Sequence, residues 1–216
     1  MKKVTEYSMN QRGLTLIEAA MVLALSAIVI SGVMYYYNAT SESYQEQQTM
    51  EMIENIISKV NALYVNASST EGLTTAVIAT QIPGVKFISQ PGDGDTPANN
   101  YIAIPGSKGG ELEVTGAPNY AYGGLNLGPH GYIISYANYH PWMQGNSAYQ
   151  VCMTLTGGQY GNSYQGAVTG GNSLASGVLL STDNTVEARA RFCNMVQKGA
   201  DDNGGTGGIA LYFNAS

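Results

Sequence analysis

Residues 12–37 read RGLTLIEAAMVLALSAIVISGVMYYY, and this stretch decides how the rest of the chain is organised. Between Leu14 and Tyr37, Glu18 is the single charged residue among 24. At about 1.5 Å per residue, a helix of that length is roughly 36 Å long, which is enough to cross a bilayer. The stretch therefore predicts a membrane-spanning helix.

Glu18 is the unusual residue of this segment. A carboxylate at the middle of a membrane helix costs about 2.5–3.5 kcal/mol on insertion scales, so an intramembrane acid suggests a function. The simpler interpretation is an acid near the start of a helix, where the macrodipole favours negative charge. We favour a functional role for Glu18.

A secretory signal peptide or a plain membrane anchor are the competing interpretations. A signal peptide has an apolar core of about 7–15 residues followed by an Ala-x-Ala cleavage site, and neither feature is found here. Lys2, Lys3 and Arg12 precede the segment, and the next basic residue is Lys59. The positive-inside rule then predicts a cytoplasmic N-terminus, with everything beyond Tyr37 on the outer side.

A glycine with basic residues upstream and a glutamate five positions after it, as in Gly13-Leu14 with Glu18, resembles the processing site of type IV pilins and related pseudopilins. In that family a prepilin peptidase cuts after the glycine, the new N-terminus is methylated, and the glutamate serves filament assembly. The resemblance implies cleavage between Gly13 and Leu14, N-methylation of Leu14, and an assembly role for Glu18. In having leucine rather than phenylalanine at position 14, the chain resembles the type IVb branch of that family.

The same resemblance implies the partners and the fold. We expect identical subunits that polymerise into a helical filament, a prepilin peptidase, the pilus assembly machinery, and the bacterial inner membrane before the subunit enters an extracellular pilus. The expected fold is α+β, with a long N-terminal hydrophobic α-helix packed on an antiparallel β-sheet head. A C-terminal region bounded by a disulfide completes this fold.

The helical pattern continues beyond the apolar segment. One apolar stripe recurs at three- and four-residue spacing, which is typical of an amphipathic helix; it comprises Met52, Ile53, Ile56, Ile57, Val60, Leu63 and Tyr64. We therefore expect a leader over residues 1–13, one helix over residues 14–66 and a globular head over residues 67–216. Within the helix, residues 14–37 are the expected membrane or filament core segment.

Composition agrees with one exported head on one stalk. The chain has 216 residues, 27 glycines and 16 tyrosines, and only 11% of its residues are charged. Its net charge is −6, with no cluster of Lys and Arg, which argues against nucleic-acid binding because phosphate neutralisation requires such clusters.

The two cysteines, Cys152 and Cys193, fall in the part of the chain expected to be exported. An oxidising compartment favours a disulfide between them, closing a 42-residue loop worth about 4 kcal/mol in the chain-entropy model. A zinc site would need further ligands, and a catalytic thiol would need a positioned histidine. In type IV pilins a disulfide near the C-terminus ties down the terminal region, so the resemblance implies the same pairing.

The head reads as short strands separated by glycine-rich turns, which favours an antiparallel sheet. The expected strands are Tyr101–Ile104, Glu111–Thr115, Gly131–Ala137, Gly177–Ser181 and Gly208–Asn214. Ala148–Leu155 and Val186–Lys198 read as short helices, the second preceded by Thr182, Asp183 and Asn184 as candidate caps. Residues 90–100 are dense in proline and glycine and read as a loop.

No catalytic constellation stands out. His130 and His140 are isolated from each other and from other candidate ligands, and no Walker loop, HExxH or GxSxG motif occurs. Asp93 and Asp95 offer two carboxylates for calcium, too few for an ion that takes about six to eight oxygen ligands. We expect no enzyme activity, no metal and no cofactor.

Three classes of function remain open from the sequence. The first is a structural major subunit of a type IVb pilus that serves adhesion or bacterial aggregation. The second is a minor pilin or a type II secretion pseudopilin, acting as initiator, tip adhesin or piston. The third is an enzyme or binding protein that carries a hydrophobic membrane anchor. The pattern around Gly13 and Glu18 favours the first.

Overall fold

The computed structural model describes residues 15–90, 99–104, 110–138, 146–158, 160–169, 178–182, 185–202 and 208–215. The chain separates into two compact units that divide between Ser41 and Glu42. The first unit holds the apolar part of helix α1, and the second holds the remainder of α1 and the head.

Helix α1 spans Leu16–Tyr64, a single element of 49 residues. No proline occurs within it, and the Ser31-Gly32 pair does not interrupt it. The helix ends where the chain turns at Val65 and Asn66. The long N-terminal helix expected from the sequence is confirmed.

The head is built on a seven-stranded sheet in which every pairing is antiparallel. The strands lie in the order β1 (Lys86–Gln90), β2 (Asn99–Ala103), β3 (Gly110–Gly116), β6 (Gly131–Asn138), β9 (Gly208–Asn214), β7 (Tyr164–Thr169) and β8 (Val178–Ser181). Strand β9, the last in the chain, lies between β6 and β7. The C-terminal segment is therefore held inside the sheet and not at its edge.

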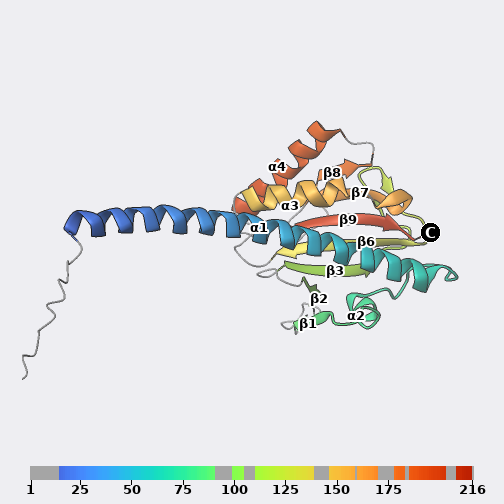
Figure 1. Ribbon diagram of the computed structural model, residues 1–216. Coiled ribbons are helices and arrows are strands. Elements are labelled where there is room, and N and C mark those ends of the chain that lie inside the picture. Colours follow the sequence, from blue (N-terminus) through green and yellow to red (C-terminus); the bar gives the residue numbers. More distant parts are fainter. Residues whose placement is uncertain are drawn as a thin grey trace, which may run out of the picture. The chain divides into compact units, whose positions relative to one another are not determined.

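One face of the sheet carries the main core. The C-terminal half of α1 lies across β3 and β6 (Figure 1), and its apolar stripe is buried against them. Alternate residues of the strands point to this helix, as the two-residue period of a strand requires. The buried residues from α1, β3, β6 and β9 are Met52, Ile53, Ile56, Ile57, Val60, Leu112, Val114, Tyr132, Ile134, Tyr136, Ile209, Leu211 and Phe213.

Two more helices extend this layer. Helix α3 (Asn146–Gly157) packs on α4 (Val186–Asp202), and α4 contacts β7, β8 and β9. A disulfide joins Cys152 of α3 to Cys193 of α4, as expected. Helix α4 begins after Thr185, whose hydroxyl accepts a hydrogen bond from the Ala188 N–H at 3.1 Å. The cap is thus Thr185 and not the preceding residues that the sequence suggested.

The opposite face of the sheet is covered by a hairpin of β4 (Ala121–Tyr122) and β5 (Leu125–Asn126). Its two-residue turn is Gly123-Gly124, and both glycines have positive φ, 58° and 94°, as a type I′ hairpin turn requires. The ring of Tyr120 stacks on Tyr212 of β9 with centroids 5.7 Å apart. The sheet is therefore buried on both faces near its centre.

A short helix, α2 (Thr75–Ala79), connects α1 to the first strand. The Thr75 hydroxyl hydrogen-bonds both the N–H and the carbonyl of Val114 in β3, which fixes α2 to the sheet. A turn of 3-10 helix, η2 (Gly161–Ser163), precedes β7. The long helix, the antiparallel sheet and the disulfide together confirm the α+β fold.

Candidate functional site

The first turn of α1 is closed by a reciprocal set of hydrogen bonds between Thr15 and Glu18. The Glu18 Oε2 atom accepts from the Thr15 backbone N–H and from the Thr15 hydroxyl, each at 2.9 Å. The Glu18 N–H in turn donates to the Thr15 hydroxyl oxygen at 3.3 Å. This is a capping box, an arrangement in which the cap residue and the residue three positions later satisfy each other's N–H groups.

The capping box assigns Glu18 a local role that the sequence analysis missed. The missing partner was Thr15, and its signal was present as a Thr-x-x-Glu pattern directly before an apolar run. Loss of such a cap typically costs about 0.5–2 kcal/mol of helix stability. Glu18 therefore has the geometry of a helix-start acid.

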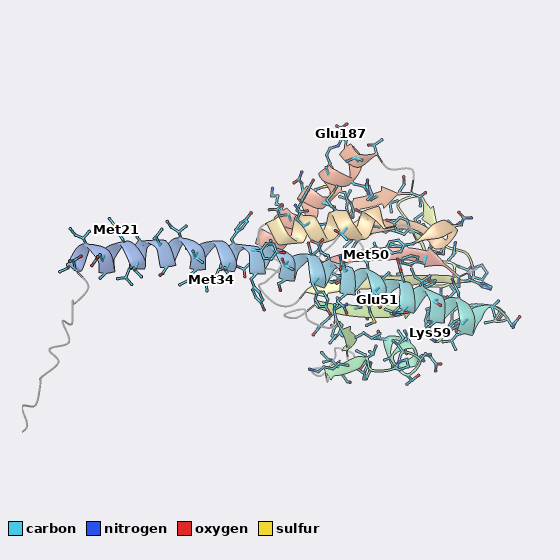
Figure 2. The ribbon with its side chains drawn as sticks, in the orientation of Figure 1. Met21, Met34, Met50, Glu51, Lys59 and Glu187 are labelled. Atoms are coloured by element: carbon cyan, nitrogen blue, oxygen red, sulfur yellow. A yellow bond between two sulfur atoms is a disulfide. The ribbon has the colours of Figure 1, made fainter. Side chains whose placement is uncertain are left out.

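The apolar part of α1 is exposed around its whole circumference. Between Leu16 and Tyr37 the large apolar and aromatic side chains are 56–88% exposed. Figure 2 shows these side chains, with Met21 and Met34 labelled, projecting from the helix on every side. A soluble monomer rarely leaves so large an apolar surface uncovered, so this surface marks a membrane or protein interaction site.

Three serine and threonine hydroxyls in or next to this segment are satisfied within the helix. The hydroxyls of Ser26, Ser31 and Thr40 donate to the backbone carbonyls of Val22, Ala27 and Tyr36, at 2.7, 2.8 and 2.9 Å. Such bonds to the carbonyl four residues earlier let a hydroxyl enter a water-free environment without losing its partner. The segment is thus suited to hydrocarbon or to a dry protein interface.

Among the described residues, α1 is the one helix long and apolar enough to cross a membrane. None of its most apolar window is buried within the subunit. The length, the exposure and the satisfied hydroxyls all belong to the same segment, which is the one that the sequence singled out.

The remaining predicted residues fall into two groups. Cys152 and Cys193 are bonded, and the structure exposes 1% and 0% of them. Gly13 and Leu14 lie outside the described residues, as do Asp93, Asp95 and His140. Within the described part of the chain, no group of three or more His, Cys, Asp or Glu residues is placed to hold a metal ion.

Comparison with known proteins points to the same segment. Residues 8–34 match the family model of the prokaryotic N-terminal methylation motif. Over 105 residues the chain is 37% identical to the major structural subunit of bundle-forming pilus from Escherichia coli O127:H6 (strain E2348/69 / EPEC), and equally to that of Escherichia coli O111:H-. Both likenesses support a type IVb-like pilin.

The match to these relatives is partial. It covers 44% of this chain and 54% of each relative, so the chain spans about half the length of the curated relatives it matches. No solved structure matches the chain. The likeness thus rests on the methylation motif and on the aligned 105 residues.

Proposed function

We propose that this chain is a pilin, the major structural subunit of a type IVb pilus, which is a surface filament for adhesion or bacterial aggregation. The exposed apolar half of α1 carries the proposal, because a helix with no cover in its own subunit needs cover from a membrane or from other subunits. The similarity to major subunits of bundle-forming pilus supports the filament as the final partner.

Processing is the first step that we propose. A prepilin peptidase cuts between Gly13 and Leu14, and the new amine at Leu14 is N-methylated. Both members of the capping box remain in the mature chain, since Thr15 becomes its second residue. The amine stays cationic at a helix N-terminus, where the macrodipole disfavours positive charge, and a carboxylate nearby offsets that cost.

Glu18 is the proposed assembly residue. In a staggered filament the Leu14 amine of one subunit lies beside Glu18 of a neighbour. Two such charges about 4 Å apart interact with roughly 4 kcal/mol at an effective dielectric of 20, although desolvation removes much of this. The pair therefore acts mainly on how neighbouring subunits are aligned in the filament, because it favours the axial stagger at which each amine meets a carboxylate.

The subunit is proposed to reside in the inner membrane first, with its head on the outer side, and then to enter the extracellular filament through the pilus assembly machinery. Its role is structural and not enzymatic. A minor pilin or secretion pseudopilin would share the N-terminal features but would be present in trace amounts. Abundance in purified filaments separates these functions.

Sheared surface filaments provide the test. Mass spectrometry should identify this chain as the dominant protein, beginning at N-methylated Leu14. A mature chain that begins beyond Tyr37, or trace abundance only, contradicts the proposal.

The role of Glu18 is tested with three variants of the full chain. Glu18→Leu should be inserted and processed but should form few filaments, because the partner of the neighbour's amine is lost. Glu54→Leu is the matched control, since it removes an exposed carboxylate from the same helix, and it should form filaments normally. Thr15→Ala breaks the capping box but keeps the acid. If Thr15→Ala lowers piliation as much as Glu18→Leu, Glu18 acts as a cap and not as an assembly residue.

A further inference from the structure

We propose that Tyr35, Tyr36 and Tyr37 form a tyrosine collar that docks in the lipid headgroup layer on the outer side of the membrane and sets the depth of α1 before assembly. The inference rests on the membrane stage of the proposed function. The partner of the tyrosine collar is the phospholipid headgroup layer. All three collar residues lie in the first unit of the chain, before Glu42.

The geometry of the collar is the first argument. Consecutive residues of an α-helix are about 100° apart, so three in a row surround most of the helix. The three side chains are 79%, 72% and 72% exposed, so each projects freely from the helix. A helix that packs on one partner repeats its contacts every three or four residues. Three adjacent tyrosines instead suit an environment that is the same on all sides.

The chemistry of tyrosine is the second argument. Its ring is apolar and its hydroxyl is polar, and tyrosine and tryptophan are enriched where hydrocarbon meets headgroups for this reason. The sequence changes character at the collar. Residues 19–34 carry no charge and are mostly apolar. Just after the tyrosines the chain becomes polar, with Asn38, Thr40 and Ser41.

The spacing between the collar and the capping box is the third argument. From Thr15 to Tyr35 there are 20 helical steps, or about 30 Å, which equals the usual thickness of the hydrocarbon core. Between these ends, the hydroxyls of Ser26 and Ser31 are bonded to the helix backbone. The segment thus has one polar boundary at each end and satisfied polar groups between them.

This placement has a consequence for Glu18. With the collar at the outer interface, Glu18 lies about 5 Å inside the Thr15 end, close to the cytoplasmic boundary and far from the bilayer centre. The basic residues Lys2, Lys3 and Arg12 then lie on the cytoplasmic side, as the positive-inside rule requires. The collar accordingly holds the carboxylate at the membrane edge, where a neighbour's amine can reach it.

A second copy of the helix is the alternative occupant. Contacts with neighbouring helices would involve the tyrosines only after polymerisation. Contact with lipid would occur before polymerisation, and contact with a second helix only after it. The test is therefore made on the subunit while it is still in the membrane.

The experiment is a cysteine scan of positions 33–40 in the full chain, expressed in cells in which filament assembly is blocked. Because Cys152 and Cys193 are disulfide-bonded and the sequence has no other cysteine, an introduced cysteine is the sole free thiol. Spheroplasts are labelled from the outer side with a membrane-impermeant maleimide. Val33→Cys should be protected and Asn38→Cys should be labelled.

Two collar variants complete the design. Replacing all three tyrosines with leucine should move the labelling boundary outward by about three residues, roughly 4.5 Å, because the apolar run then extends past position 37. Replacing them with tryptophan should leave the boundary in place, because tryptophan occupies the same interface.

The outcomes are distinct. An unchanged boundary in the leucine variant overturns the proposal. If the leucine variant also loses filaments in assembly-competent cells while its boundary is unchanged, the tyrosines contact other subunits and the membrane role is wrong. If the wild-type chain is released from membranes by alkaline carbonate, the membrane stage of the proposed function fails as well. A boundary that shifts with leucine and stays with tryptophan supports the collar.

Discussion

The two halves of helix α1 are apolar in different ways. In the first half Ile28 is 69% exposed, whereas in the second half Ile56 is completely buried. The residue type and the helix are the same, and no break separates them. The difference lies in the pattern, since the first half is apolar all round and the second half has one apolar stripe and one polar face, to which Glu51 and Lys59 belong (Figure 2).

This comparison shows how one helix serves two purposes. Burying an isoleucine is worth roughly 1.5–3 kcal/mol, and the second half of α1 gains this within its own subunit. The first half leaves its apolar surface exposed. The second half therefore contributes to the stability of the head, and the first half is the part that, in the proposed function, enters the membrane and then the filament.

The largest expected effect on stability comes from the disulfide, which lies entirely in the head. Cys193→Ser should lower the free energy of unfolding of the full chain in detergent by about 2–5 kcal/mol and reduce its steady-state amount, because the closed loop no longer restricts the unfolded state. Near-UV circular dichroism of the tyrosines during denaturation measures the change.

The matched control is Cys152→Ala combined with Cys193→Ala, which removes the bond without burying a hydroxyl. Membrane insertion of both variants should equal that of the wild type, because the apolar half of α1 is unchanged. Two free thiols titrating in the non-reduced native protein would refute the bond itself.

A pair of isoleucine substitutions tests the comparison directly. Ile56→Ala should cost about 2–5 kcal/mol of unfolding free energy, because it leaves a cavity between α1 and the sheet. Ile28→Ala should leave the unfolding of the head unchanged. Denaturant titration of both full-length variants in the same detergent gives the two values. Equal losses would mean that the two halves of α1 do not differ as their exposure indicates.

The sequence was most informative where a pattern is long or repeated. The apolar stripe from Met52 to Tyr64 predicted the packed half of α1. Strand-like pieces between glycine turns predicted strands at Gly131–Ala137 and Gly208–Asn214, and the structure has them at Gly131–Asn138 and Gly208–Asn214. The disulfide was predicted because the chain has two cysteines and both fall in the part expected to be exported to an oxidising compartment. Long-range order within the sheet, with β9 between β6 and β7, has no local signal in the sequence.

The missed elements have specific physical reasons. Strand β7 contains Gly166 at φ 145°, where an added Cβ would lie 2.7 Å from the Leu180 carbonyl oxygen, so close strand approach and not side-chain pattern explains this residue. The β4–β5 hairpin has a local signal in Gly123-Gly124, which lies between Tyr122 and Leu125. The cap at Thr15 has its signal in the Thr-x-x-Glu pattern, which the charge of Glu18 alone does not reveal.

Helix caps extend the comparison at a smaller scale. Thr185→Ala should destabilise the head by about 1 kcal/mol, because the hydroxyl that accepts from the Ala188 N–H is lost from the first turn of α4. Thr15→Ala removes a comparable cap from the first half of α1 but should not change the unfolding of the head. Thermal denaturation of both full-length variants compares the two caps, and a destabilised head in Thr15→Ala would couple regions that we expect to be independent.

The smallest expected effect concerns a glutamate of the head, in contrast to Glu18 of the stalk. Glu113 of β3 is partly buried opposite Ser135 of β6, and this burial raises the pKa of its carboxyl above the ordinary value. The folded state then holds this proton more tightly than the unfolded state does. Its contribution to stability is present at acidic pH and is lost as the pH rises through the raised pKa.

Glu113→Gln should therefore be slightly more stable than the wild type at pH 7 and should flatten the fall in stability above about pH 4.3. Glu54→Gln, on the exposed face of α1, is the matched control for the loss of one carboxylate. Unfolding midpoints of the three full-length proteins between acidic and neutral pH decide the matter: parallel profiles for Glu113→Gln and the wild type would show that burial of this carboxyl does not influence the stability of the head.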